Sequence, residues 1–335
     1  MTVKFITQNK STINKKNTQR TIFPLMVILM ILLVYSCNKD GKDEVNSTES
    51  LEDYIAQNNP LITAHRGFAE AAPENTMSAF EAALNAGTDA CEFDVHMTLD
   101  GVLVVFHDDT IGRTTNGTGK LSELTYDYLS TLDAGSWKDP KFVGEKIPTL
   151  KQTLDYFKAN NMVAVLEIKV ADIVDEVLEI LYATKMEKRT VIISFAESAI
   201  AKIKSEEPDI PALLLVYANQ YMTGDSQSKA DNIMQKADEL GTKYIGPFSF
   251  QLEKLDPALL PEVVYNLYNN LDPGELPLAL DTETLAILHE NGYLIDAWTV
   301  DSEENMRDLI NSNVDFLTTN YLERAINMKK EFLKK

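Results

Sequence analysis

The sequence predicts an α/β protein of the TIM (β/α)8 barrel type, with a small insertion after the second strand. From Leu61 onwards, short apolar and β-branched runs alternate with stretches that have the period of an amphipathic helix. Strands that alternate with helices pair in parallel, and about eight such units close into a barrel. The chain has 335 residues, 44% of them hydrophobic, which suffices for a barrel with a large core. The structural alternative is an open, doubly wound sheet.

Eight apolar runs are predicted as strands, and helices are predicted between them. The strands are Leu61–Ala64, Ala90–His96, Val163–Ile168, Thr190–Ser194, Ala212–Val216, Tyr244–Gly246, Leu294–Thr299 and Phe316–Thr319. The helices are Thr76–Ala86, Thr149–Ala159, Ile173–Thr184, Ala196–Lys204, Lys229–Leu240, Thr282–Asn291 and Ser302–Asn311. Two segments interrupt this alternation. Val102–Phe106 follows the turn signal Leu99-Asp100-Gly101. The predicted insertion, residues 108–147, is rich in Gly, Thr and Asp and has no clear period.

The first 36 residues have the pattern of a secretory signal peptide. Five basic residues and no acid occupy the first 20 positions, and the apolar run Leu25–Val34 ends just before Cys37. A cysteine at this place resembles the lipobox of bacterial lipoproteins, in which it is lipidated and becomes the new N-terminus. We therefore expect residues 1–36 to be a lipoprotein-type signal peptide. Cys37 would anchor the protein to a membrane of the cell envelope, outside the cytoplasm, facing the periplasm or the cell surface. The alternative is an uncleaved single-pass anchor.

The rest of the chain divides into a tether and the barrel. Residues 37–59 are predicted to be a flexible acidic tether, because they are polar and have little to bury. Residues 60–335 are predicted to be the barrel. The formal net charge of −20 argues against a nucleic-acid partner, which would require a basic face. No sequence feature indicates an obligate protein partner, and no Walker loop, dinucleotide fingerprint or Gly-x-Ser-x-Gly elbow is present.

Acidic side chains on two predicted strands are candidates for a metal site. Glu92 and Asp94 are two residues apart, so a strand directs both carboxylates to the same side. Two like charges repel, and a divalent cation with a preference for oxygen ligands would remove that cost. Glu167 could supply a third carboxylate, and Lys169 a positive charge for a substrate anion. The alternative is a structural ion pair between Glu92 and Lys169.

Two histidines follow apolar runs and are candidates for acid–base catalysis. His65 comes directly after the first strand, and His107 comes after Val102–Phe106. Histidine is the side chain best suited to proton transfer near neutral pH, and phosphodiester cleavage needs one base and one acid. Arg66 is a candidate phosphate ligand, because its guanidinium matches phosphate oxygens. Trp298 is an aromatic group at the end of the seventh strand.

These residues belong to an ordered series of motifs that resembles the glycerophosphodiester phosphodiesterase family, over roughly residues 61–322 and most densely over 61–169. The motifs are His65-Arg66-Gly67, Pro73-Glu74-Asn75-Thr76, Ala79-Phe80, Glu92-Phe93-Asp94-Val95, Thr98-Leu99-Asp100-Gly101, Val104-Val105-Phe106-His107-Asp108, Arg113-Thr114-Thr115, Ile147-Pro148-Thr149-Leu150, Leu166-Glu167-Ile168-Lys169 and Trp298-Thr299-Val300. One motif departs from the family. Where the family often has Thr-Asp-x-Pro after the last strand, this chain has Thr319-Asn320-Tyr321-Leu322. We expect a change in loop structure or polarity there without loss of chemistry.

The resemblance implies roles for individual residues. It implies that Glu92, Asp94 and Glu167 hold one divalent cation, Ca²⁺ or Mg²⁺, and that His65 and His107 are the general acid and base. It implies that Arg66 and Lys169 hold the phosphate, and Trp298 joins them as a candidate substrate contact.

The expected reaction is hydrolysis of glycerophosphodiesters, small molecules, to glycerol 3-phosphate and an alcohol. The rival enzyme is a lysophospholipase D-like or phosphoinositol-diester phosphodiesterase on the same barrel, which would favour an apolar lip at the mouth, formed for example by Tyr217, Met222, Phe248 and Phe250. The non-enzyme alternative is a surface lipoprotein that binds glycerophosphate groups without cleaving them.

Overall fold

The computed structural model describes residues 50–216, 224–247 and 280–334. The predicted signal peptide, Cys37, the first part of the predicted tether and the four residues of the expected apolar lip lie outside the described residues. Among the described residues, no helix has both the length and the hydropathy that a membrane span requires.

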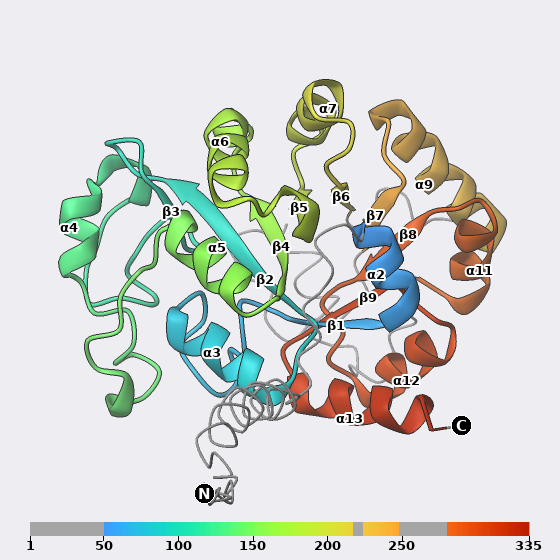
Figure 1. Ribbon diagram of the computed structural model, residues 1–335, viewed down its shortest axis with the longest axis horizontal. Coiled ribbons are helices and arrows are strands. Elements are labelled where there is room, and N and C mark those ends of the chain that lie inside the picture. Colours follow the sequence, from blue (N-terminus) through green and yellow to red (C-terminus); the bar gives the residue numbers. More distant parts are fainter. Residues whose placement is uncertain (1–49, 217–223, 248–279, 335) are drawn as a thin grey trace, which may run out of the picture. The chain divides into compact units, whose positions relative to one another are not determined.

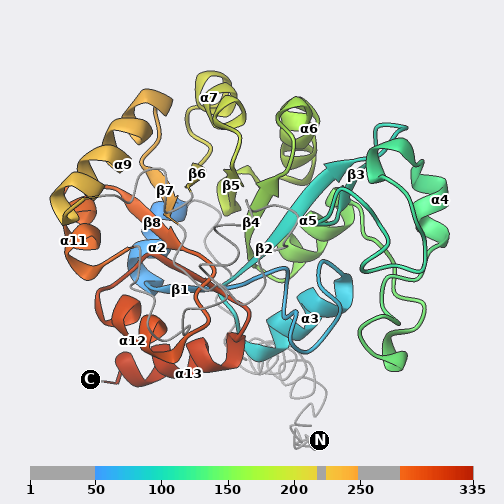
Figure 2. The same cartoon turned by 180° about the vertical axis from the view of Figure 1, so that it is seen from behind.

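Eight parallel strands in the described part of the chain form a closed ring (Figures 1 and 2). They are β1 (Leu61–Ala64), β2 (Ala90–Met97), β4 (Val163–Ile168), β5 (Thr190–Ser194), β6 (Ala212–Val216), β7 (Tyr244–Pro247), β8 (Leu294–Ala297) and β9 (Phe316–Thr319). The ring closes at β1, where Thr63 lies opposite Ala90 of β2 on one side and Thr318 of β9 on the other. The predicted (β/α)8 barrel is therefore confirmed, and the open-sheet alternative is wrong.

A ninth strand and the insertion lie outside the ring. Strand β3 (Leu103–Val105) pairs antiparallel with the end of β2, and Gly101 in the turn between them has a φ of +81°, which glycine adopts without strain. The following segment contains the short helices η1 (Leu121–Glu123), α4 (Tyr126–Thr131) and η2 (Pro140–Phe142). They surround a small apolar cluster of their own, which includes Ile111, Leu129 and Ile147. The insertion thus has a separate small core beside β2.

Helices surround the ring and connect its strands (Figure 1). They are α3 (Met77–Ala86), α5 (Leu150–Ala159), α6 (Val174–Thr184), α7 (Glu197–Glu206), α9 (Ser226–Leu240), α11 (Thr282–Glu290), α12 (Glu303–Asn311) and α13 (Leu322–Phe332), with the one-turn helices η3 (Ala171–Ile173) and η4 (Glu187–Arg189). Local signals explain several of their ends. Thr149 and Gln152 form a capping box before α5, and Gly87 ends α3 with a φ of +86°.

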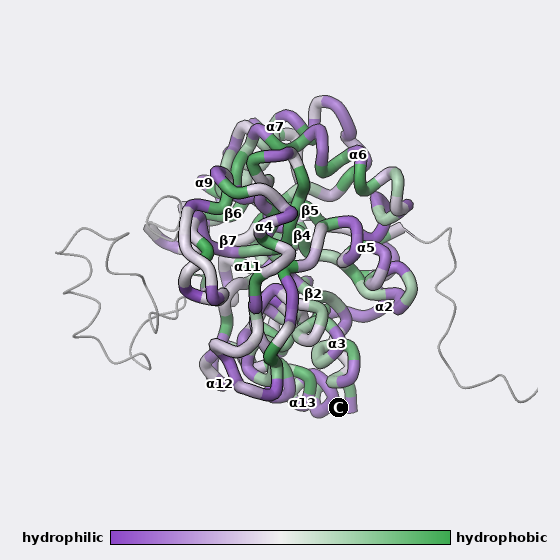
Figure 3. Tube along the Cα trace, turned by 90° about the vertical axis from the view of Figure 1, so that its left-hand side faces the viewer, coloured by the Kyte–Doolittle hydropathy of each residue, from purple (hydrophilic) through white to green (hydrophobic). Residues whose placement is uncertain are grey.

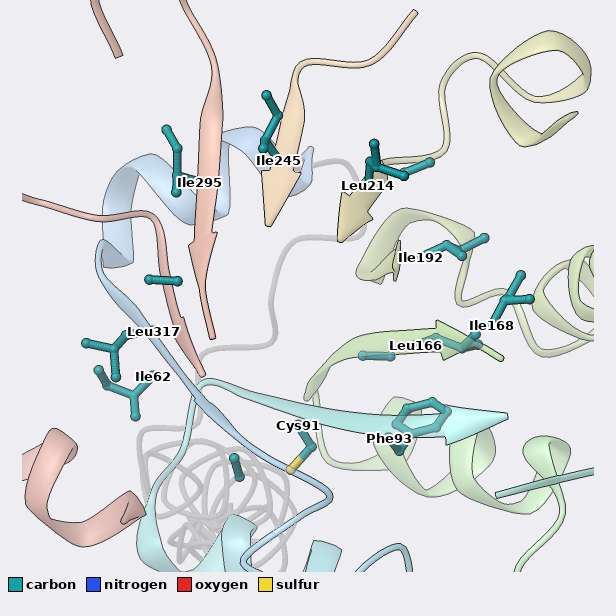
Figure 4. Close-up of a cluster of buried hydrophobic side chains, with 14 of the residues drawn as sticks. Ile62, Cys91, Phe93, Leu166, Ile168, Ile192, Leu214, Ile245, Ile295 and Leu317 are labelled. Atoms are coloured by element: carbon teal, nitrogen blue, oxygen red, sulfur yellow. The ribbon is translucent and has the colours of Figure 1, made fainter. Parts of the chain in front are cut away.

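Alternation along the strands builds two apolar layers. Ile62, Phe93, Leu166, Leu214 and Ile295 point outwards from the ring and pack against the helices (Figure 4). Residues of the opposite parity point into the barrel, where Val163, Val191 and Phe316 belong to a second cluster near the N-terminal ends of the strands. Hydrophobic residues accordingly concentrate in the central strands, whereas the helices alternate between hydrophilic and hydrophobic (Figure 3). The inner positions at the C-terminal ends of the strands are left for polar side chains.

The predicted flexible tether, residues 37–59, is wrong for its last part, because helix α2 (Leu51–Asn58) lies there. Ser50 caps the helix by accepting a hydrogen bond from the Asp53 amide. Leu51 and Ile55 are buried against Leu61 and the first residues of the other strands. The helix therefore covers the N-terminal end of the barrel, opposite to the end where the strands finish.

Candidate active site

Three buried carboxylates meet at the C-terminal ends of β2 and β4. Asp94 lies directly opposite Glu167 in the parallel register, and Glu92 is two residues before Asp94 on the same face. One oxygen from each of the three side chains lies within 4.8 Å of the others. The structure therefore brings Glu92, Asp94 and Glu167 together, as the strand spacing predicts. Buried oxygen donors of this kind suit a hard divalent cation.

Burial and mutual repulsion together set the electrostatics of this carboxylate cluster. Burial raises the pKa of Glu92 well above its ordinary value, and the charges of Asp94 and Glu167 raise it further. Burial also raises the pKa of Glu167. Burial would raise that of Asp94 as well, but Lys169, His107 and Arg66 outweigh it and hold the pKa of Asp94 below its ordinary value. The cluster thus has more negative charge than its neighbours neutralise easily, which favours a bound cation.

Lys169 follows β4 and contacts two of the three carboxylates. Its Nζ lies 2.7 Å from Glu167 Oε1 and 3.2 Å from Asp94 Oδ1. Among the contacts of the described residues, Lys169 therefore pairs with Asp94 and Glu167 and not with Glu92, the partner that the structural alternative required. The carboxylates raise the pKa of Lys169 despite its burial, so it stays an ammonium.

His65 presents one ring nitrogen to the carboxylate cluster. Its Nδ1 lies 2.8 Å from Asn320 Oδ1, and its Nε2 lies 4.0 Å from Glu92 Oε2. Asn320 donates its amide to the carboxylate of Asp301, so its Oδ1 is the acceptor and His65 Nδ1 the donor. Nε2 is then the unprotonated nitrogen of the neutral ring. Burial, aided by Arg66, lowers the pKa of His65 to about 4.

His107, like His65, forms a side-chain hydrogen bond through its Nδ1. Its Nδ1 lies 2.6 Å from Oδ1 of Asp108, a carboxylate whose pKa is lowered by hydrogen bonds from His107 and Arg113 in spite of partial burial. A carboxylate can only accept, so Nδ1 again donates and Nε2 is left for substrate. The residue before it, Phe106, donates its amide to the Asp94 carbonyl at 2.9 Å, so His107 directly follows a backbone contact with Asp94.

Arg66 lies between the first histidine and the carboxylates. Its backbone has a φ of +55°, and its amide donates to Glu92 Oε2 at 2.8 Å. The guanidinium donates to Glu74, and its Nε, 3.6 Å from Asp94, is buried without a hydrogen-bond partner among the described residues. Gly67 follows with a φ of +74°, and a Cβ there would lie 2.8 Å from that of Ala79. Glycine is therefore required for this tight turn.

Trp298 lies at the end of β8. Its Nε1 donates to the Gly246 carbonyl at 2.7 Å, and its ring contacts Phe195 edge to face with centroids 5.3 Å apart. A side chain at position 246 would collide with Leu213 and approach Trp298 Nε1, so glycine leaves room for the indole. Trp298 is half-buried, and these two contacts orient its indole ring.

Several residues that orient this site were not predicted from the sequence to have a role. Asn75, with a φ of +56°, donates to Asp94 Oδ2 at 2.7 Å and accepts the Asp94 amide. Asn320 and Asp301 orient His65, and Asp108 orients His107. Most of them lie in the quoted motifs, but periodicity and spacing alone assign them no partner.

Asp296, inside the barrel on β8, leads to a prediction about stability. Burial raises its pKa to about 7, and Thr318 donates it a hydrogen bond of 2.8 Å. Because the folded-state pKa lies above the unfolded value, stability is lost as the pH rises from about 4 to about 7, by up to about 4 kcal/mol. Asp296→Asn should therefore increase the free energy of unfolding at pH 8, and by less at pH 5, in urea denaturation. An equal effect at both pH values would contradict this, and Asp209→Asn at an exposed position is the control.

Comparison with known proteins identifies the family. Residues 65–324 match the model of the glycerophosphoryl diester phosphodiesterase family. The chain belongs to this family. A glycerophosphodiester phosphodiesterase of Caldanaerobacter subterraneus subsp. tengcongensis is 30% identical over 276 residues, 81% of this chain and 98% of that relative. Another, from Bacillus subtilis, is 27% identical over 338 residues, 95% of this chain and 100% of that protein.

Solved structures have the same barrel. A phosphodiesterase of Oleispira antarctica, in complex with the product sn-glycerol-3-phosphate, is 23% identical with a TM-score of 0.64, over 82% of this chain and 99% of that one. A glycerophosphodiester phosphodiesterase of Agrobacterium tumefaciens is 25% identical with a TM-score of 0.61, over 80% and 99%. As a member of the glycerophosphoryl diester phosphodiesterase family, the chain is a phosphoric diester hydrolase. The family generally binds a divalent metal, and the carboxylate cluster could hold one.

Proposed function

We propose that this enzyme hydrolyses glycerophosphodiesters to sn-glycerol 3-phosphate and an alcohol, with His65 and His107 as base and acid. The observation that carries the proposal is that both histidines use Nδ1 for a hydrogen bond within the protein and keep Nε2 for substrate. His65 Nε2 lies 4.0 Å from Glu92 of the carboxylate cluster, and His107 directly follows Phe106, whose amide donates to the Asp94 carbonyl at 2.9 Å. The product bound to the Oleispira antarctica relative supports the substrate class.

The carboxylate cluster fits one divalent cation, Ca²⁺ or Mg²⁺. Glu92, Asp94 and Glu167 offer only oxygen atoms, are buried, and repel one another. When bound, the cation supplies Lewis-acid stabilisation of negative charge on the phosphate and on the attacking oxygen. Asn75 keeps Asp94 in position through two hydrogen bonds, and the Arg66 amide does so for Glu92.

His65 is the proposed base. Its low pKa keeps it neutral, and Asn320 keeps the proton on Nδ1, so Nε2 can take the proton of the attacking glycerol 2-hydroxyl. The hydroxyl attacks phosphorus within the same molecule, which gives a large proximity advantage. As the bond to the alcohol breaks, His107 Nε2 donates the proton that the leaving oxygen needs. Water then opens the cyclic phosphate with the two histidines in exchanged roles.

The phosphate is held by positive charge from two directions. Arg66 has a buried Nε without a partner among the described residues, and Lys169 lies beside Asp94 and Glu167. Both can stabilise the charge that develops on the phosphorus oxygens. Trp298 offers a fixed aromatic surface at the mouth for the glycerol or alcohol part of the substrate.

We also propose the cellular location that the N-terminal pattern predicts. Residues 1–36 would be removed as a signal peptide, and lipidated Cys37 would anchor the enzyme in the cell envelope, outside the cytoplasm. The basic flank, the apolar run and the cysteine support this. The net negative charge of the chain argues against a nucleic-acid partner.

A substrate panel tests the proposed function. Glycerophosphocholine, glycerophosphoethanolamine, glycerophosphoinositol and lysophosphatidylcholine are assayed side by side with Ca²⁺ or Mg²⁺, and glycerol 3-phosphate release is measured. We expect turnover of the small glycerophosphodiesters. Preference for lysophosphatidylcholine would favour the lysophospholipase D-like alternative, and preference for the inositol diester the phosphoinositol one. Binding without turnover of any substrate would favour the glycerophosphate-binding lipoprotein.

A further inference from the structure

We propose that Arg113, from the insertion, is a positioning residue that connects the proposed acid His107 to the phosphate-binding Arg66 through two carboxylates. This inference rests on the proposed function, because it assigns Arg113 a task in that reaction. Arg113 lies outside the barrel ring, and its side chain is 46% exposed, so it is not needed to fill the core.

On one side, Arg113 holds the partner of His107. Its Nε donates to Asp108 Oδ2 at 2.6 Å and its second terminal nitrogen to Asp108 Oδ1 at 2.9 Å. The same Oδ1 lies 2.6 Å from His107 Nδ1. The guanidinium thus fixes the plane of the Asp108 carboxylate, and the carboxylate fixes the ring of His107.

On the other side, Arg113 holds the partner of Arg66. Its two terminal nitrogens donate to Glu74 Oε2 at 2.9 Å and to Oε1 at 2.7 Å. Glu74 Oε1 also accepts from Arg66 at 2.9 Å. Although Glu74 is largely buried, hydrogen bonds from Arg113 and the charge of Arg66 lower its pKa to about 2. It therefore stays an anion and connects the two arginines.

The chain of contacts joins two segments that are separate in the sequence. Arg66 and Glu74 belong to the loop after β1, whereas His107, Asp108 and Arg113 belong to the segment that follows β3, in which the insertion begins at residue 108. An arginine is required at the centre, because its planar guanidinium donates four hydrogen bonds, one pair to each carboxylate. A lysine ammonium has only three N–H donors and cannot form both pairs. The insertion therefore sets the distance between the group that protonates the leaving oxygen and the group that binds the phosphate.

The test compares two leaving groups in the same variant. Arg113→Lys keeps the charge but loses the paired geometry, and it should lower kcat/KM for glycerophosphocholine by about 10- to 100-fold, as a displaced catalytic group does. Glycerol p-nitrophenyl phosphate releases p-nitrophenolate, which needs no proton. If Arg113 positions the acid, the loss of kcat/KM with this substrate should be several-fold smaller than the loss with glycerophosphocholine. His107→Ala, which removes the acid itself, should also lose less with the p-nitrophenyl substrate.

The ratio between the two substrates is measured within one protein preparation, so a change in the folded fraction cancels. Arg113→Gln is the second variant, and Arg307→Lys, in an exposed pair on α12, is the matched control. An unchanged kcat/KM, or an equal loss with both substrates, would overturn the inference. Inactivity of the wild-type enzyme on both diesters would instead refute the proposed function, so the two failures are distinguishable.

Discussion

Replacement of His65 by alanine is expected to lower kcat by about 10²- to 10⁴-fold, the usual contribution of a general base. The reason is geometric. Asn320 keeps the proton on Nδ1, and Nε2 faces the carboxylate cluster 4.0 Å from Glu92. Alanine leaves no group there that can accept a proton. Steady-state kinetics on a glycerophosphodiester, with thermal unfolding of the same preparation, checks the prediction.

His289→Ala is the control for this experiment. His289, on α11, pairs with Asp315 at 2.8 Å, near the N-terminal end of β9 and away from the proposed chemistry. Its loss can affect stability but should leave kcat unchanged. If His65→Ala retained a kcat near that of the wild type while folded, His65 would be excluded as the base.

Replacement of Glu92 by glutamine is expected to lower the affinity for the divalent cation by about 100-fold or more. Loss of a residue that only hydrogen-bonds a metal ligand usually lowers metal affinity by about 10- to 100-fold, and loss of a direct ligand should cost more. Glutamine keeps an oxygen that can accept the Arg66 amide, which now donates to Glu92 at 2.8 Å. Titration calorimetry with Ca²⁺ and with Mg²⁺ measures the loss directly, and turnover should fall with it.

Stability provides a second readout for the same variant. In chelator, the wild-type protein buries three carboxylates that repel one another, and Glu92→Gln relieves part of that repulsion. The variant should therefore melt above the wild type in chelator, and added cation should reverse the order. Glu239→Gln, at an exposed position of α9, is the control. Full wild-type activity in excess chelator would refute the metal site.

The strands could be predicted closely because each is a short buried run that no helix period explains. The predicted bounds are confirmed for five strands, which are β1, β4, β5, β6 and β9. Strand β8 ends at Ala297, two residues before its predicted end. The helix ends differ by up to three residues, because caps and frayed turns contribute little to the hydrophobic pattern. Helix α13 was not predicted at all.

The directions of the site residues also followed from the sequence, whereas their partners did not. Period-two alternation places Glu92, Asp94 and Glu167 on the inner face of neighbouring strands. The contacts of Asn75, Arg113 and Asn320 depend on loops whose paths no periodicity describes. At the motif that departs from the family, the neutral amide of Asn320 accepts a hydrogen bond from His65 Nδ1. Helix α2 was missed because its few apolar residues pack against strand starts that lie far away in the sequence.

The position of α2 decides where a recombinant form of this enzyme can begin. Ile55 is 1% exposed and shares a cluster with Leu61, Val163 and Phe316. A protein trimmed to start at Pro60 would present this apolar floor to water, and such a surface promotes aggregation. A start at or before Ser50 keeps both the cap and the cover, so the natural boundary for expression lies ahead of α2 and not at the first strand.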